Sequence, residues 1–320
     1  MRRLTFFLLA CFLLPACGPR GGKTVPAPAA RPFPAVEVPG IYTDPGERTR
    51  FAILHFWDAF TDTAATWPCD SVTVNGVPSG KLEEQMGLWA TLLDQLLLED
   101  GAAATARLYD RLDAFERRDT ASTVFEEMVR LTTKYLYDAN SPCRNEDLYL
   151  PFVSRLGRSD LVEKGLRAGY EWDARMCALN RVGTPAADFS FTDTKGRVRT
   201  LYGIKAEYTV LIFGNPGCEA CREMTEAMAA SETVASLLRE GRLQVVDVYI
   251  DREIEDWKAH ADSYPAAWIN GYDHNYAIRR DMNYHVRAIP SMYLLSREKS
   301  VLLKDAPQEK ILRMLEAATR

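Results

Sequence analysis

The sequence lacks the features that mark several large protein classes. Its 39 Lys and Arg residues against 44 Asp and Glu residues give a formal net charge of −5, and no basic stretch carries interleaved aromatic residues. A nucleic-acid partner is therefore not expected. Only four histidines are present, and none has the spacing of a metal ligand relative to the cysteines. We therefore expect no metal site and no bound cofactor.

Long hydrophobic runs are also missing. The apolar run over residues 4–14 is shorter than the roughly 20 residues of a membrane-spanning helix. It ends at Leu-Pro-Ala-Cys17, which resembles a bacterial lipobox. The resemblance implies a signal peptide over residues 1–16 and lipidation of Cys17, and a plain secretory signal is the alternative. Gly18 after the cysteine favours the outer membrane. We expect a lipid anchor on the periplasmic side of that membrane, in a bacterial cell envelope.

The remaining chain divides into a tether and two domains, which suits 320 residues at about 150 residues per domain. Residues 17–39 are rich in Pro and Gly and predict an extended tether. Residues 40–178 predict an all-α domain, because apolar residues recur at three and four positions. The expected helices cover residues 82–98, 102–115, 122–137, 145–156 and 160–176. No pair of acid and base residues is evident in this domain, and its role stays open.

Residues 179–320 alternate between strand and helix patterns. Strands are expected at residues 189–192, 198–201, 208–213, 243–250, 292–295 and 301–304. Helices are expected at residues 221–240, 255–261, 275–282 and 307–318. This alternation predicts an α/β domain with a mixed sheet and helices on both faces.

The chemistry concentrates in Cys218-Glu219-Ala220-Cys221, which directly follows the strand at residues 208–213. A strand that leads into C-x-x-C at the start of a helix is typical of a thioredoxin-like redox site. The helix N-terminus favours the thiolate of Cys218. Cys221 lies one helical turn away, near enough to resolve a mixed disulfide.

Three motifs in order resemble the TlpA/ResA-like branch of the thioredoxin superfamily. They are Gly-Thr-Pro-Ala-Ala-Asp-Phe at residues 183–189, the C-x-x-C motif, and Ile289-Pro290-Ser291. The resemblance implies an exported, membrane-tethered thiol–disulfide oxidoreductase with a thioredoxin-like fold. Residues 140–149 resemble a stretch of a helical domain of unknown function that precedes such domains in some bacterial lipoproteins. That second resemblance brings no activity with it.

The first resemblance also assigns roles to residues. Cys218 is the expected nucleophile and Cys221 the resolving cysteine. Pro290 is the expected cis-proline facing the dithiol, which leaves the Ile289 backbone free to pair with an extended substrate. The implied partners are disulfide-containing envelope proteins and an electron donor that the sequence does not identify.

Two usual carboxylates are missing from the motif. Thioredoxin has a buried Asp where Ile212 stands here, and related proteins have a Glu at the position of Met224. Glu219 and Glu223 are the nearest carboxylates and could tune the dithiol, but the proton partner of Cys221 stays open. Cys69, Cys143 and Cys177 are three further cysteines, which leave room for one structural disulfide, with Cys69–Cys143 as a trial pairing.

The sequence is compatible with three functions. The favoured one is a membrane-anchored envelope enzyme that reduces protein disulfides through its dithiol. A non-enzymatic lipoprotein, whose helical domain binds a partner, is the alternative. A peroxidase-like relative would need an activated cysteine within a Thr/Cys/Arg pocket, and no such local motif is evident in the sequence.

Overall fold

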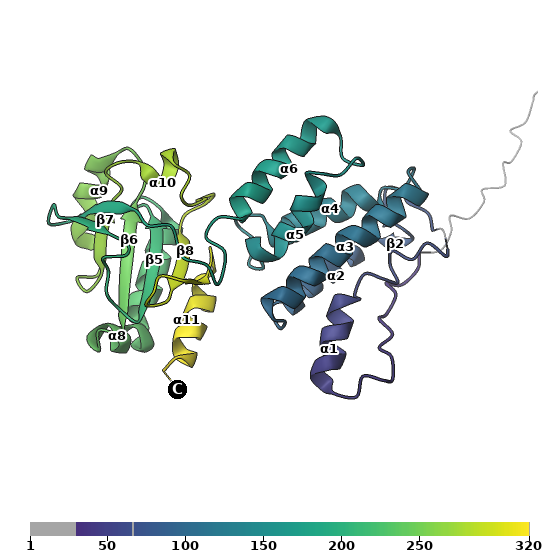
Figure 1. Ribbon diagram of the computed structural model, residues 1–320, viewed down its shortest axis with the longest axis horizontal. Coiled ribbons are helices and arrows are strands. Elements are labelled where there is room, and N and C mark those ends of the chain that lie inside the picture. Colours follow the sequence, from purple (N-terminus) through teal and green to yellow (C-terminus); the bar gives the residue numbers. More distant parts are fainter. Residues whose placement is uncertain (1–29, 66, 320) are drawn as a thin grey trace, which may run out of the picture.

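The computed structural model describes residues 30–65 and 67–319. The predicted signal peptide and the lipidation site Cys17 lie outside these residues. Within them the chain forms two parts, a helical part and an α/β part with a mixed sheet (Figure 1). This arrangement confirms the predicted fold class.

The helical part contains six helices and one short hairpin. The helices are α1 (Pro45–Leu54), α2 (Ser79–Leu93), α3 (Leu98–Arg118), α4 (Val124–Leu136), α5 (Glu146–Leu156) and α6 (Lys164–Cys177), and the hairpin joins β1 (Thr73–Val74) to β2 (Val77–Pro78). In α3, buried Ala104, Leu108, Leu112 and Phe115 follow helical spacing and form one apolar face. Buried Trp89 of α2 donates from Nε1 to the carbonyl of Ile53, 3.0 Å away. Packing of these apolar faces therefore joins the helices around one core.

The α/β part is built on a seven-stranded sheet. Its strands are β3 (Ser190–Asp193), β4 (Val198–Thr200), β5 (Tyr208–Gly214), β6 (Leu243–Tyr249), β7 (Ile269–Tyr272), β8 (Ser291–Leu295) and β9 (Val301–Leu303), in the spatial order β4-β3-β7-β6-β5-β8-β9. The central pairs β5–β6 and β6–β7 are parallel, and the other pairs are antiparallel. The sequence analysis missed β7, because its Ile-Asn-Gly-Tyr sequence carries little strand signal.

Helices cover both faces of this sheet. They are α7 (Glu219–Ala230), α8 (Glu232–Arg239), α9 (Ile254–His260), α10 (Ala277–Arg280) and α11 (Gln308–Ala317), with a 3₁₀ turn η1 (Ala261–Ser263). Alternate residues of β5 point to opposite layers. Val210 and Ile212 pack with α7, α8 and α11, whereas Leu211 and Phe213 pack with the α10 side.

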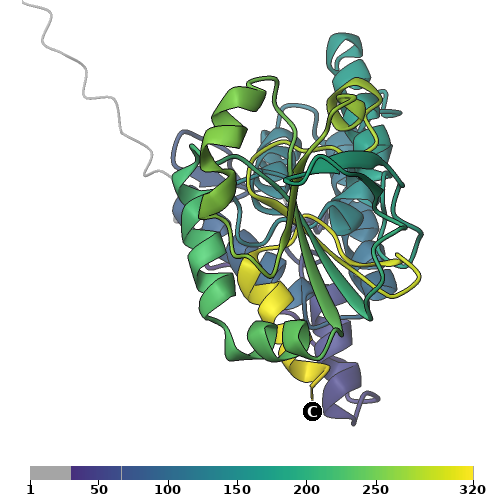
Figure 2. The ribbon, with the colours of Figure 1, turned by 90° about the vertical axis from the view of Figure 1, so that its left-hand side faces the viewer.

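The single helix predicted over residues 221–240 is wrong, because Ser231 interrupts it and divides it into α7 and α8. This residue is extended (φ −72°, ψ 119°), and its hydroxyl accepts the Val234 N–H at 3.4 Å, so it caps a new helix, α8. Figure 2 shows α7 and α8 in front of the helical part, which lies behind the sheet in that view.

Candidate functional site

Cys218 is the N-cap of α7 and faces Cys221 across the first helical turn. Its backbone is extended (φ −95°, ψ 117°), and its Sγ accepts the Cys221 N–H at 3.2 Å in the manner of a helix N-cap. Cys218 is half-buried, whereas Cys221 is buried, and both are free thiols. The cysteine nearer the surface is therefore the one placed to meet a substrate.

The loop before β8 closes the other side of Cys218. The Ile289–Pro290 peptide bond is cis, which is the geometry predicted there. The Cys218 thiol donates to the Ile289 carbonyl, with 3.7 Å between Sγ and oxygen. The structure thus brings together all four residues that the sequence analysis placed at the dithiol and its substrate loop.

The two candidate tuning carboxylates lie on the solvent side of α7. Glu219 pairs with Arg222, whose Nε lies 3.0 Å from its Oε2, and this hydrogen bond lowers the pKa of Glu219. Glu223 is exposed. Each of these two described side chains lacks a hydrogen bond to Cys218 or Cys221. The structure therefore shows no hydrogen bond through which either carboxylate would act on the dithiol.

A buried carboxylate that sequence reasoning missed lies behind the dithiol. Asp247 of β6 pairs in register with Ile212 of β5, and it is 2% exposed. It points to the same layer as Val245, which packs with the α7 methionines. A side chain on Gly214 would come within 3.2 Å of its Oδ1, so the glycine leaves the space that the carboxylate occupies.

Burial governs the protonation of this site. It raises the pKa of Asp247 to about 7, because the charged form has lost its water. Burial also raises the pKa of Cys221, and the hydrogen bond with Cys218 and the charge of Asp247 add to that rise. The pKa of Tyr264 rises mainly through burial and then through the charges of Asp247 and Cys221. Asp247, Cys221 and Tyr264 thus form one electrostatically coupled group.

A cavity of about 340 Å³ reaches this group from the side of α9 and η1. Its lining includes Asn215, Cys221, Thr225, His260 and Tyr264. Cys221 therefore lines a small cavity, and Cys218 does not line it. One sequence signal could have identified the buried acid, since Asp247 is the only charged residue in the apolar strand Leu-Gln-Val-Val-Asp-Val-Tyr.

The trial disulfide Cys69–Cys143 is wrong. Cys69 accepts the Asn75 N–H at 3.2 Å, and the Cys143 sulfur lies 3.6 Å from the Thr91 hydroxyl. Both cysteines are free thiols, as is buried Cys177. Separate local partners therefore hold the sulfurs of Cys69 and Cys143.

Across residues 30–65 and 67–319, no group of three or more His, Cys, Asp or Glu side chains is arranged to hold a metal ion. Within the same residues, no helix has the length and apolar character needed to cross a membrane.

The fold and the dithiol site define a thioredoxin-like protein. The chain is similar to the crystal structure of a thioredoxin-like protein from Bacteroides caccae, with 32% identity over 90% of this chain and 99% of that chain, and a TM-score of 0.76. The chain therefore belongs to the family of thioredoxin-like proteins that this structure represents.

Other comparisons cover one part of the chain each. The C-terminal domain of an uncharacterized protein from Bacteroides fragilis is 42% identical over 43% of this chain and 98% of that chain, with a TM-score of 0.42. A domain of unknown function, DUF5106, matches residues 18–171. No curated protein matches the chain.

Proposed function

We propose that the protein is a thiol–disulfide oxidoreductase that reduces disulfides of other proteins through Cys218 and Cys221. The observation that carries this proposal is the placement of Cys218. Cys218 caps helix α7, and its half-buried sulfur accepts the Cys221 N–H and contacts the Ile289 carbonyl of the cis-proline loop. A sulfur so placed lies near the surface, beside a backbone that an extended substrate can pair with.

In the first step, the Cys218 thiolate attacks one sulfur of the substrate disulfide. The Cys218–substrate S–S bond forms, the substrate S–S bond breaks, and the second substrate sulfur leaves as a thiolate that takes a proton from water. The Ile289 backbone holds the substrate strand beside the dithiol.

In the second step, Cys221 resolves the mixed disulfide. Its thiol transfers a proton to the Asp247 carboxylate, and the resulting thiolate attacks Cys218 Sγ. The Cys218–Cys221 disulfide forms and the first substrate sulfur leaves. The substrate has gained two electrons, and an external dithiol donor must return two electrons to the protein. An acid with a pKa of about 7 suits proton transfer near neutral pH.

The proposed setting is the bacterial cell envelope, in the TlpA/ResA-like branch. Support comes from the sequence alone, through the lipobox at Cys17 and the motifs shared with exported, tethered reductants. The Pro- and Gly-rich residues after Cys17 would let a lipid-anchored body reach partners some distance from the periplasmic face of the outer membrane. Replacing Cys17 by Ala should release the protein from membranes, and continued attachment would count against the anchor.

A turnover assay tests the enzymatic proposal. The purified protein with dithiothreitol as donor should reduce an insulin-type disulfide. Cys218→Ser should abolish turnover, and Cys221→Ser should accumulate a mixed disulfide through Cys218. Equal activity of the wild type and Cys218→Ser would refute the proposal and favour the non-enzymatic interaction protein.

A further inference from the structure

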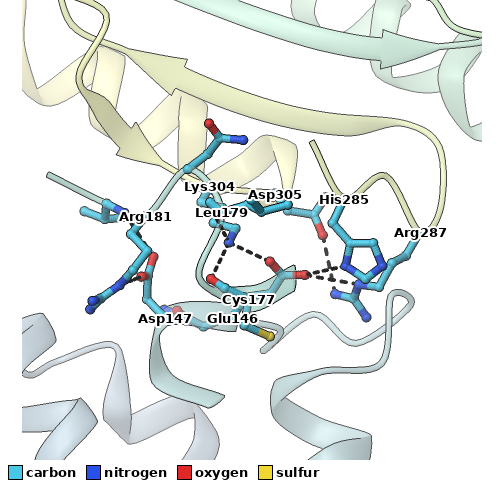
Figure 3. Close-up of polar contacts among 12 residues, drawn as sticks. Glu146, Asp147, Cys177, Leu179, Arg181, His285, Arg287, Lys304 and Asp305 are labelled. Carbon is cyan, nitrogen blue, oxygen red and sulfur yellow. Dashed lines mark hydrogen bonds and ion pairs between the residues drawn. The ribbon is translucent and has the colours of Figure 1, made fainter. Parts of the chain in front are cut away.

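A buried charged cluster joins the helical part to the α/β part (Figure 3). We call it the interface cluster. Its members are Arg144 from the loop before α5, Glu146 at the start of α5, and His285, Arg287, Lys304 and Asp305 from the α/β part. The interface cluster thus contains two carboxylates, three permanent cations and a histidine, drawn from both parts of the chain.

Glu146 is the central member of the interface cluster. Its side chain is 2% exposed, its Oε2 lies 2.7 Å from the Lys304 ammonium, and its Oε1 lies 3.2 Å from Arg287 Nε. Burial would raise the pKa of Glu146, but the contact with His285 and the charges of Lys304 and Arg287 hold it at about 2. The carboxylate is therefore ionised and paired at neutral pH.

The interface cluster holds the cis-proline loop through polar contacts on both sides of Pro290. Before the proline, the Arg287 guanidinium donates to the Tyr137 carbonyl and lies 4.0 Å from the centre of the Tyr137 ring, besides pairing with Glu146. After it, the Ser291 hydroxyl donates to Asp305 Oδ1 at 2.8 Å. The other oxygen of Asp305 lies 3.3 Å from Arg144 Nε.

Ile289 lies between these two attachments, with its carbonyl 3.7 Å from the Cys218 sulfur. From this geometry we infer that the helical part contributes to the dithiol site. Its residues Glu146 and Arg144 are positioning residues for the cis-proline loop. They fix the Ile289 backbone against which a substrate strand pairs. This inference rests on the proposed function and assigns the helical part a role in substrate binding.

Steady-state kinetics of variants at Glu146 and Arg144 test the inference. Glu146→Gln keeps the shape of the side chain and removes the charge that holds Arg287 and Lys304. It should raise KM for a peptide disulfide by about fivefold or more while kcat stays within about twofold, because substrate and transition state use the same loop. Arg144→Gln should raise KM less, and Arg144→Lys should restore part of the loss.

A matched control breaks the contact between the two parts elsewhere. Asp94 pairs with Lys310 of α11 at 2.8 Å, and both side chains are partly exposed. Asp94→Asn should leave KM and kcat unchanged. An increase in KM equal to that of Glu146→Gln would show general loosening of the interface and would overturn the assignment of positioning residues.

A second readout does not depend on turnover. Alkylation of Cys218 by iodoacetamide, followed by mass spectrometry of its peptide, reports whether the Ile289 carbonyl still contacts the sulfur. Glu146→Gln and Arg144→Gln should react faster than the wild type, by about threefold or more, whereas Asp94→Asn should not.

The outcomes separate the inference from the proposed function. A wild-type protein without reductase activity defeats the proposed function, and the alkylation rates then decide whether the interface cluster positions the loop. If Glu146→Gln does not fold, Arg144→Gln decides. Folded variants with wild-type KM and wild-type alkylation rates would overturn the inference.

Discussion

Two regions on either side of the cis-proline loop each hold a carboxylate that is almost fully buried, with opposite consequences for its pKa. As whole residues, Asp247 behind the dithiol and Glu146 between the helical and α/β parts are 2% and 3% exposed. Asp247 lies against Gly214 and apolar side chains, and its pKa rises to about 7. Glu146 is surrounded by Lys304 and Arg287, and its pKa falls to about 2. Equal burial therefore says nothing about protonation until the neighbouring charges are known.

This difference separates an acid that can exchange a proton from one that holds structure. A group that titrates near neutral pH can accept the Cys221 proton and return it in each cycle. A permanently ionised group cannot, but it can fix two cations in place. The predictions below test this contrast, beginning with the largest expected effect.

Glu146→Gln should lower the free energy of unfolding at pH 7 by about 3–5 kcal/mol, because buried Lys304 loses its carboxylate partner and Arg287 loses one of its two. Denaturant unfolding of the wild type and the variant measures this loss. A loss below about 1 kcal/mol would mean that water or rearrangement compensates the cations that lost their partner. The contrast between a structural Glu146 and a titrating Asp247 would then weaken.

Asp247→Asn should change the free energy of unfolding in the opposite direction and stabilise the protein at high pH. The folded-state pKa of Asp247 is raised from 3.8 to about 7, so its ionisation disfavours the folded state increasingly as pH rises between these values. The variant should therefore gain up to about 4 kcal/mol at pH 8 and little at pH 4. The measurement is denaturant unfolding at both pH values, and a gain equal at both would contradict the raised pKa.

The pH dependence of wild-type stability should show both carboxylates. Because the pKa of Glu146 is lowered from 4.5 to about 2, its contribution is present above pH 4.5 and is lost as pH falls toward 2. That contribution is about 3 kcal/mol. Unfolding is measured from pH 2 to 8. In Glu146→Gln, the loss of stability as pH falls toward 2 should disappear. In Asp247→Asn, the loss of stability as pH rises from 4 to 7 should disappear. Persistence of either decline in its variant would assign it to another group.

The smallest effect is expected from the exposed interface pair. Asp94→Asn should change the free energy of unfolding by less than about 0.5 kcal/mol, since solvent screens Lys310 and Asp94 already. The same unfolding assay applies. A cost comparable with that of Glu146→Gln would show that exposure does not distinguish the two kinds of pair.

The sequence predicted most of the fold and the dithiol because both depend on local signals. Helical spacing, alternating strands and the C-x-x-C motif each lie within short windows, and cis-Pro290 belongs to a three-residue motif. The break at Ser231 was missed, because apolar spacing continues across it and the capping serine is a weak signal beside that spacing.

Asp247 and the interface cluster could not be predicted because they depend on contacts between distant segments. Asp247 reaches the dithiol layer through the register of β5 and β6 and through the space left by Gly214. Glu146 and Arg287 lie 141 residues apart. Spacing alone drew attention to Glu219 and Glu223, which neighbour the cysteines in sequence but are exposed in the fold.

The most direct test of the account follows the resolving step alone. A mixed disulfide between Cys218 and a chromogenic aromatic thiol is formed, and release of that thiol by Cys221 is recorded from pH 5 to 9. Release in the wild type should have a rate that rises through a midpoint near pH 7, and release in Asp247→Asn should be slower and lack that midpoint. No release in the wild type, or identical profiles in the two proteins, would contradict this prediction.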